Sequence, residues 1–268
     1  ANLMAANSIG VLGSGIDNAF ETDVSTLAAV TTGDGAINIR QSSALAVDTV
    51  AEFTVDRVAS DATTDVTNTT VAARSDLRTA GDGAIVLRVI SGDLTLNGGL
   101  AGAGQNESVV AGGSGSIRLE TLANSLTANA DILSNTGIIT VIGGINVDLS
   151  VDVDVVTAAS ISIAAEAGSL TMDGTANVEA TGNSARLAAA LDLTAGNVIA
   201  SNVSLVSGAN ISNAVGSSKN VIATNLRIEA TGSVGEATRH LTTDVDSVSV
   251  DSSTGSIFIT EDDSVIVT

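Results

Sequence analysis

The 268-residue chain is acidic, with 30 Asp and Glu against 10 Lys and Arg, which gives a formal net charge of −20. This balance excludes nucleic-acid binding as a main function, because a phosphate backbone needs a basic surface. Cysteine is absent, so disulfides, thiolate metal sites and thiol catalysis are excluded as well. No apolar run reaches the roughly 20 residues that a membrane-spanning helix needs.

The apolar residues are of an unusual kind. Hydrophobic residues make up 44% of the chain, but only 3 are Phe and none is Trp or Tyr. A globular core would therefore lack the large aromatic side chains that usually fill its centre. Val, Ile, Leu and Ala can fill a narrow interior instead. Proline is absent too, which is typical of strands that are hydrogen-bonded on both sides, because proline has no N–H for the ladder.

The N-terminal part of the chain contains short strands between turns of Gly and Asp. Strands are expected at residues 36–40 and 44–47, and again after Gly81. Three departures from this pattern are expected: a helical turn at residues 24–30, a strand of a coil at Phe53, Val55 and Val58 followed by a polar excursion at 59–68, and a Gly-rich loop at 100–115.

A regular cycle of short strands runs from Ser116 to Asn225, with a period of about 20 residues. Its first strands begin near Ile117, Ile139, Ile161, Ala185, Val203 and Leu226. Second strands begin at Leu45, Leu94, Leu126, Val147 and Leu170. Third strands lie near Leu133, Val155, Val178, Val198 and Val221.

Alternation of apolar and polar residues within these strands places one set of side chains inward and the other outward. Three strands per cycle predict an all-β fold, a single-stranded parallel β-helix with triangular coils of about 22 residues and loop insertions. Roughly 10 to 12 coils would form a rod about 50 to 60 Å long. The inward stack is expected to include Ile117, Ile139, Ile161, Leu126, Val147 and Leu170.

Asparagines recur in the turn before a new coil, at Asn135, Asn183, Asn202 and Asn225. Asn tolerates the left-handed conformation that a tight corner needs, and its amide can stack in a ladder. Simple turn preference and a ladder both fit these positions.

A second, longer period relates the two ends of the chain. Ile257 and Ile259 match Ile37 and Ile39, whereas Val234-Gly235 matches Ile9-Gly10 at a slightly larger offset. We therefore expect residues 1–268 to form one elongated β-helix. Within it, residues 1–225 would be one tandem unit, roughly 220 residues long, and residues 226–268 would be the start of the next.

Both end segments contain the same features in the same order: an Ile-Gly or Val-Gly head, an acidic connector, G-x-I-x-I and a second strand. This order resembles the tandem repeats of giant bacterial surface exoproteins. Those repeats belong with the filamentous-haemagglutinin-like adhesins. The resemblance is carried by the two end segments, and the middle resembles the family only as generic coils. It implies a right-handed β-helical shaft, located outside the cell or on the bacterial cell surface.

Two acidic regions are candidate calcium sites, because adjacent carboxylates offer the oxygen ligands that Ca²⁺ prefers. The competing interpretation is a solvated strand face that keeps a rod soluble and prevents lateral association. The first region contains Asp148, Asp152 and Asp154, and the second contains Asp244, Asp246, Asp251, Glu261, Asp262 and Asp263.

Catalysis is not expected. The outward arginines Arg40, Arg88, Arg118, Arg186 and Arg227 look scattered, and His240 has no evident partner. No GxSxG, HExxH or Walker pattern occurs. No catalytic or cofactor-binding residue is therefore assigned, and no cofactor other than calcium is considered.

The leading hypothesis is a structural module of an extracellular filament or adhesin shaft. Its partner would be itself, end to end, either within a longer tandem chain or between chains, with surface glycans or other cells as further partners. One alternative is a glycan-active β-helix enzyme, a polysaccharide lyase or hydrolase. Another is a calcium-rigidified adhesin of immunoglobulin-like modules, which the missing aromatics and the short strand period argue against.

Overall fold

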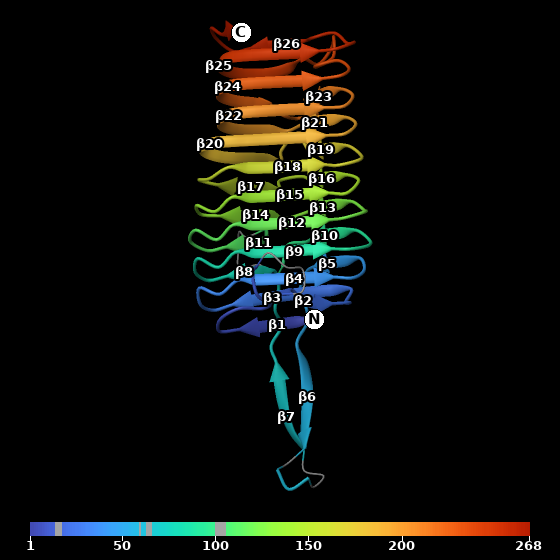
Figure 1. The fold of residues 1–268 in the computed structure, drawn as a ribbon, viewed down its shortest axis with the longest axis vertical. Coiled ribbons are helices and arrows are strands. Elements are labelled where there is room, and N and C mark those ends of the chain that lie inside the picture. The colour runs from blue at the N-terminus through green and yellow to red at the C-terminus, as the bar shows by residue number, and fades with distance from the viewer. Residues whose placement is uncertain (14–17, 59, 63–65, 100–105) are drawn as a thin grey trace.

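The computed structural model describes residues 1–13, 18–58, 60–62, 66–99 and 106–268. Short parallel strands are wound into a column of stacked coils, and one β-hairpin projects from it (Figure 1). The described residues contain no α-helix, and among them no helix is long and apolar enough to span a bilayer. The fold is therefore all-β, a parallel β-helix as the strand spacing predicts. Its right-handed sense stays a prediction.

Each coil contributes one strand to each of three faces. Face 1 contains β2 (Phe20–Thr22), β4 (Ile37–Gln41), β9 (Ile85–Val89), β12 (Ile117–Thr121), β15 (Ile139–Gly143) and β18 (Ile161–Ala165). Face 2 contains β5 (Leu45–Val47), β10 (Leu94–Leu96), β13 (Leu126–Ala128), β16 (Val147–Leu149), β19 (Leu170–Met172), β21 (Leu193–Ala195) and β23 (Ile211–Asn213). Face 3 contains β1 (Asn2–Ala5), most of β3 (Thr26–Thr31), β8 (Leu77–Thr79), β11 (Glu107–Ala111), β14 (Asp131–Ser134) and β17 (Asp154–Thr157).

The C-terminal coils have longer strands, each of which passes from face 3 to face 1. These strands are β20 (Asn177–Ala189), β22 (Asn197–Ser207), β24 (Val221–Ala230) and β25 (Leu241–Ser252). Two short strands complete the column, β26 (Ile259–Glu261) on face 3 and β27 (Ile266–Val267) on face 1.

The predicted register is confirmed on face 1. Parallel pairing joins Ile117, Ile139, Ile161, Ala185, Val203 and Leu226 rung by rung. On face 2, pairing joins Leu45, Leu94, Leu126, Val147 and Leu170. On face 3, eleven rungs follow one another: Leu3, Ala29, Leu77, Val109, Ile132, Val155, Val178, Val198, Val221, Thr243 and Glu261.

The interior of the column is filled by these inward aliphatic side chains. The six that the sequence predicts, including Ile139 and Val147, are at most 2% exposed. The third strand that the sequence places near Leu133 is β14. Ile132 is the inward partner of Val155 and is fully buried, whereas Leu133 points outward, since neighbours on a strand face opposite ways.

Three expected departures from regular coils differ in the structure. Residues 24–30 do not form a helical turn, because residues 26–31 form strand β3, which pairs with β5 and then with β8. Phe53, Val55 and Val58 do not continue a coil. They belong to β6 (Phe53–Val58), which pairs antiparallel with β7 (Val66–Val71) in the projecting hairpin. In the expected 100–115 loop, residues 107–111 form β11, and residues 100–105 lie outside the described part.

The two ends of the column make the same local contacts. Ile9 forms a parallel bridge to Ile37, and Val234 forms the corresponding bridge to Ile257. The pairings that follow also correspond: Phe20–Ile39 with Leu241–Ile259, Thr22–Gln41 with Thr243–Glu261, Leu27–Val47 with Val248–Val267, and Leu3–Ala29 with Ile228–Val250.

A glycine in the left-handed region follows the bridge residue at both ends. The φ angle is 71° at Gly10 and 70° at Gly235. A Cβ atom at Gly10 would lie 2.2 Å from the carbonyl oxygen of Asn38, and one at Gly235 would lie 2.1 Å from that of Phe258. Only glycine fits this backbone in either copy.

The matching segments lie on different faces of the column. Ile37 is on face 1, but its counterpart Ile257 is on face 2, eight rungs above Leu45. Val47 is on face 2, but its counterpart Val267 is on face 1. The longer period of the sequence therefore corresponds to more than eight coils and fewer than nine, and the second copy is rotated about the long axis.

Replacing Ile139 with Asp tests the stacked interior. Ile139 is fully buried between Ile117 and Ile161, so a carboxylate there would be unpaired, and we expect a loss of about 3 kcal/mol or more in the free energy of unfolding. Urea denaturation followed by circular dichroism measures this loss. Thr140→Asp, on the outward side of the same strand, is the control and should cost less than about 1 kcal/mol. Equal effects of the two variants would contradict the stacked interior.

Candidate functional site

One group of three carboxylates comes together among the described residues. Asp244 on β25, Glu261 on β26 and Asp263 each offer one oxygen atom, and the three atoms lie within 4.8 Å of one another. We call these three residues the C-terminal acidic cluster. Parallel stacking explains their closeness, because Thr243, the neighbour of Asp244, is the rung partner of Glu261.

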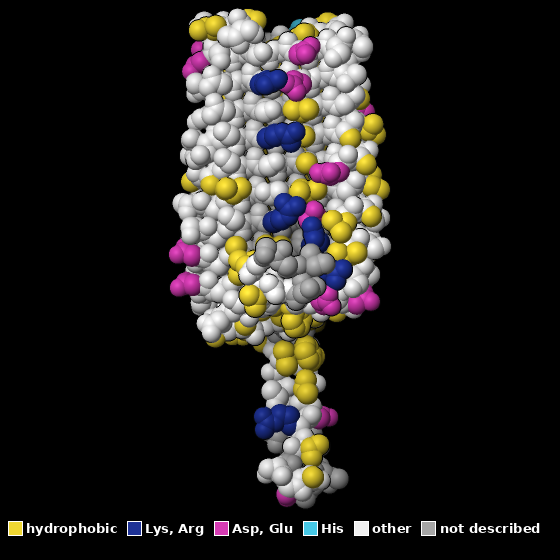
Figure 2. Space-filling model, in the orientation of Figure 1, with side chains coloured by type: hydrophobic (Ala, Val, Ile, Leu, Met, Phe, Trp, Pro, Cys, Tyr) yellow, Lys and Arg dark blue, Asp and Glu magenta, His cyan; other side chains and the backbone are white. Residues whose placement is uncertain are grey.

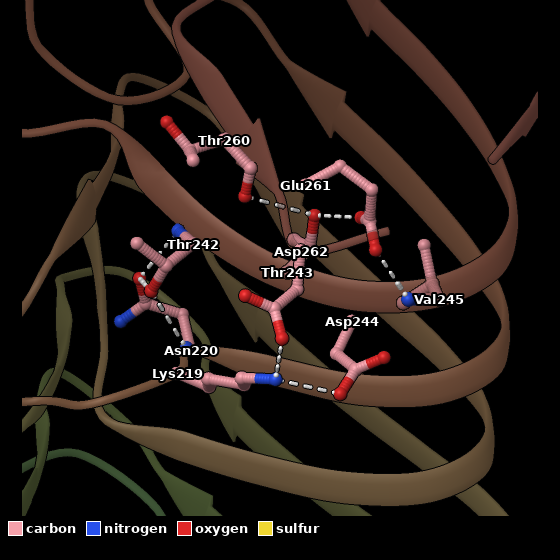
Figure 3. A network of polar contacts seen from close by, with 9 residues as sticks. All are labelled: Lys219, Asn220, Thr242, Thr243, Asp244, Val245, Thr260, Glu261 and Asp262. Atoms are coloured by element: carbon pink, nitrogen blue, oxygen red, sulfur yellow. Dashed lines mark hydrogen bonds and ion pairs between the residues drawn. The ribbon is translucent and has the colours of Figure 1, made fainter. Parts of the chain in front are cut away.

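Glu261 is held in place by the strand below it (Figure 3). Its carboxylate accepts hydrogen bonds from the hydroxyl of Thr243 and from the backbone N–H of Val245, the latter at 2.9 Å. Lys219 approaches from the next coil down, with Nζ 2.6 Å from Oδ2 of Asp244 and 2.6 Å from Oδ2 of Asp262. Hydrogen bonds to Asp244 and then to Asp262 raise the pKa of Lys219 above its ordinary value. One fixed cation thus faces several anions.

The matching position in the first copy carries less charge. There Gln41 replaces Glu261, and its Oε1 accepts hydrogen bonds from the hydroxyl of Thr22 at 2.7 Å and from Val24 N–H at 3.3 Å. Its Nε2 donates to Ser43, which in turn donates to Asp23 at 2.5 Å. The first copy therefore has one carboxylate, Asp23, with a hydrogen-bond donor beside it. The second copy has carboxylates at all three matching positions, Asp244, Glu261 and Asp263.

The acidic cluster offers hard oxygen donors of the kind that suits Ca²⁺. Asp244, Glu261 and Asp263 are three of the residues that the sequence predicts for this region, and Asp262 is the ion-pair partner of Lys219. Asp246 is exposed and is not part of the group. Calcium binding itself stays a prediction.

The structure does not gather Asp148, Asp152 and Asp154 into a group of this kind within its described part. Asp148 lies half-buried on β16, whereas Asp152 is exposed in a turn with a φ of 57°. The backbone N–H of Asp154 donates to Asp131 at 2.9 Å. Strand and turn separate these carboxylates, although they are close in sequence.

The arginines are not scattered as the sequence suggests. Arg118, Arg186 and Arg227 occupy one outward column of face 1, joined through Thr140, Ser162 and Ser204. Arg40 and Arg88 stack in the neighbouring column, where Glu120 follows them. Figure 2 shows dark-blue side chains at several levels along the face toward the viewer. The shared face could not be read from the sequence, because residues inserted between coils hide the register.

Two grooves lie on face 1. The lower groove, of about 250 Å³, is lined by residues that include Arg40, Arg88, Arg118 and Glu120. The carboxylate of Glu120 lies 2.9 Å from Arg88 Nε and 3.2 Å from Arg118 Nη2. The upper groove, of about 470 Å³, is lined by Ser184, Ala185, Arg186, Asn202, Val203, Ser204, Asn225, Leu226, Arg227, Ser247, Ser249 and Thr268.

Part of the expected asparagine ladder runs along the upper groove. Asn225 donates through Nδ2 to Oδ1 of Asn202 at 2.9 Å, and Ser247 donates to Oδ1 of Asn225 at 2.9 Å. Asn183 instead donates to the backbone carbonyl of Ala158. The ladder is therefore short.

His240 has a partner, contrary to expectation. Its Nδ1 lies 2.8 Å from Oγ1 of Thr260, and its ring centroid lies 5.8 Å from that of Phe258. No acidic side chain of the described residues forms an ion pair with it.

No protein-family model, curated protein sequence or solved structure matches this chain.

Replacing Asp148 with Asn tests the effect of burial on an outward acid. Burial raises the pKa of Asp148 above its ordinary value of 3.8, and a hydrogen bond from Thr171 opposes the shift. The folded protein therefore holds this proton more tightly than the unfolded chain, so charged Asp148 is unfavourable at neutral pH. Asp148→Asn should raise the melting temperature at pH 7, and the gain should vanish as the pH falls below about 4. Asp34→Asn, at an exposed turn residue, is the control. A gain that grows on acidification would contradict this assignment.

Replacing Glu261 with Gln tests the C-terminal acidic cluster, because it restores the amide of the first copy. When a metal chelator is present, we expect Glu261→Gln to slow hydrogen exchange of the β25 and β26 amides. The substitution removes a negative charge next to those of Asp244 and Asp263, and with it their mutual repulsion. Calcium should slow exchange in the unaltered protein more than in the variant. The matched control is Gln41→Glu, which should speed exchange in β2 and β4. The same exchange rates with calcium and with chelator would exclude the calcium site.

Proposed function

We propose that this chain is a structural segment of an extracellular filament or adhesin shaft. The observation that carries the proposal is the correspondence of the two ends, which repeat the same bridges, rungs and left-handed glycine. A coil that recurs at both ends gives a β-helix a way to continue, because each coil forms the pairing surface of the next.

The interior of the column supports a mechanical role. Backbone ladders run along all three faces, and most buried side chains are aliphatic, with buried Thr, Ser, Asn and Gln among them. Pulling such a shaft along its axis would load many backbone hydrogen bonds together. The net charge of −20 would keep neighbouring shafts apart.

The terminal coils provide the surface for continuation. At the C-terminal end, the inward side chains of Ile257 and Val267 are 48% and 77% exposed. In a longer tandem chain the next coil would cover these side chains. In the version with separate chains, the open edge would pair with another copy. We place this function outside the cell or on a bacterial surface.

The lower groove favours a second candidate, the binding or cleavage of an acidic glycan. Arg40, Arg88 and Arg118 could pair with uronate carboxylates. Glu120, the carboxylate that lines the groove, is already paired with Arg88 and Arg118, so it is not free to contact a glycan. Turnover or binding on a panel of polysaccharides would favour this candidate, and Arg88→Ala should then weaken it.

A protein of two joined units tests the shaft. Thr268 corresponds to Asp48, so residues 1–268 followed directly by a second copy of residues 49–268 would continue the pattern without a gap. We expect one melting transition, at a higher temperature than that of the single chain, because the exposed terminal coil gains a partner. Two transitions, one of them at the single-chain temperature, would contradict continuation.

Sizing of the single chain tests the version in which separate chains stack. Light scattering at increasing concentration should then detect end-to-end oligomers. A species that stays monomeric would exclude this version and leave the tandem one.

A further inference from the structure

The projecting hairpin is the part of the molecule with the least support from the column. Its strands β6 and β7 extend along the long axis, past β1 and beyond the N-terminal end of the coils (Figure 1). Phe53, Val55 and Val58 are 45%, 44% and 72% exposed. Hydrophobic side chains line the hairpin in Figure 2. A two-stranded hairpin is marginally stable in water by itself, so this one needs a surface to pack against.

The base of the hairpin is fixed against the outward side of β1. Asn2 donates through Nδ2 to the carbonyl of Ala72 at 3.0 Å, and Arg74 donates through Nε to Oδ1 of Asn2 at 2.7 Å. Val50 and Arg74 close the base with two backbone hydrogen bonds. The hairpin therefore leaves the column over β1 in a defined direction.

The repeat identifies what lies below β1 in a tandem chain. Leu3 corresponds to Ile228, so Asn2 corresponds to Arg227 on β24. Below Arg227 on face 1 come Ser204 and then Arg186. A hairpin that starts at the next unit would pass over these residues.

The upper groove lies on this path. It begins at Thr268, the counterpart of Asp48, from which the chain enters the hairpin in the first copy. It then continues past Ser249 to Arg227, Ser204 and Arg186. Its lining is mostly of small side chains, which leave room for a bulkier one.

We propose that the hairpin of each unit is a clasp that docks lengthwise into the upper groove of the preceding unit. Its partner is therefore another copy of this sequence, and the inference rests on the proposed tandem shaft. Phe53 and Val55, on one side of β6, supply the apolar contact.

Spacing fits this arrangement. Three residues along β6 cover about 10 Å, and two coil spacings also cover about 10 Å. Phe53 pairs with Val71, next to the Ala72 that Asn2 contacts, so in a tandem chain it starts level with Arg227, and β6 reaches the level of Arg186 at Asp56. Phe53 and Val55 face the groove over this length, whereas Asp56 faces away from it, because neighbours on a strand point in opposite directions.

The rotation between copies has a consequence for the arrangement of these clasps. In the first copy the chain enters the hairpin after a strand of face 2, whereas the corresponding point of the second copy follows a strand of face 1. Successive clasps would therefore leave from different corners and wind around the shaft, so no single line of clasps would form along one side.

The two-unit protein tests the clasp with an internal control. The chain has no cysteine, so Val55→Cys can be introduced into either hairpin alone. The second hairpin faces the upper groove of the first unit, but the first hairpin has no unit before it. We expect a thiol reagent to modify the second hairpin at least about tenfold more slowly than the first.

A substitution that fills the groove locates the docking surface. Ser204→Trp in the first unit should remove most of the protection of the second hairpin, since the indole would occupy the space that Phe53 and Val55 enter. The same substitution in the second unit, which no hairpin covers, should leave the protection unchanged. Circular dichroism confirms that both variants fold.

The outcomes separate this inference from the proposed function. Equal modification of the two hairpins in a protein that electron microscopy shows as one continuous rod would overturn the clasp and leave the shaft. A two-unit protein that forms two separate bodies would overturn both.

Discussion

The stacking of inward aliphatic side chains on parallel rungs is the constraint on which the rest of the structure depends. Each rung of Ile, Leu or Val is buried only because another rung lies above and below it. The backbone ladder sets the spacing at about 4.8 Å, so side chains of similar shape recur at the same position. A core of this kind has no centre, and it can lengthen without a change in composition.

The same constraint explains the charge and the chemistry of the surface. Outward positions also stack, so equal charges at one position of successive coils come close together. Ser and Thr separate Arg118, Arg186 and Arg227, and Lys219 lies between Asp244 and Asp262. Arg40 and Arg88 stack directly, but each is paired with a glutamate. No such residue separates Asp244, Glu261 and Asp263, so these three carboxylates lie close together on the surface.

Much of the fold could be predicted from the sequence, because alternation and spacing are local signals. They correctly placed Ile139 on Ile161 and Leu126 on Val147. The hairpin was missed because Phe53 and Val55 alternate just as residues of a coil do, and only the loss of stacking distinguishes them. The acidic cluster was predicted in part. The match between the two ends would have shown that Glu261 replaces Gln41, whereas exclusion of Asp246 depends on geometry.

The length of the two-unit protein in solution tests the central claim, that the coil of one unit continues into the next. Small-angle X-ray scattering measures both the maximum dimension and the radius of the cross-section. A repeat of between eight and nine coils predicts a gain of about 40 Å in length with an unchanged cross-section. A thicker particle, or two rods joined by a flexible link, would contradict the account.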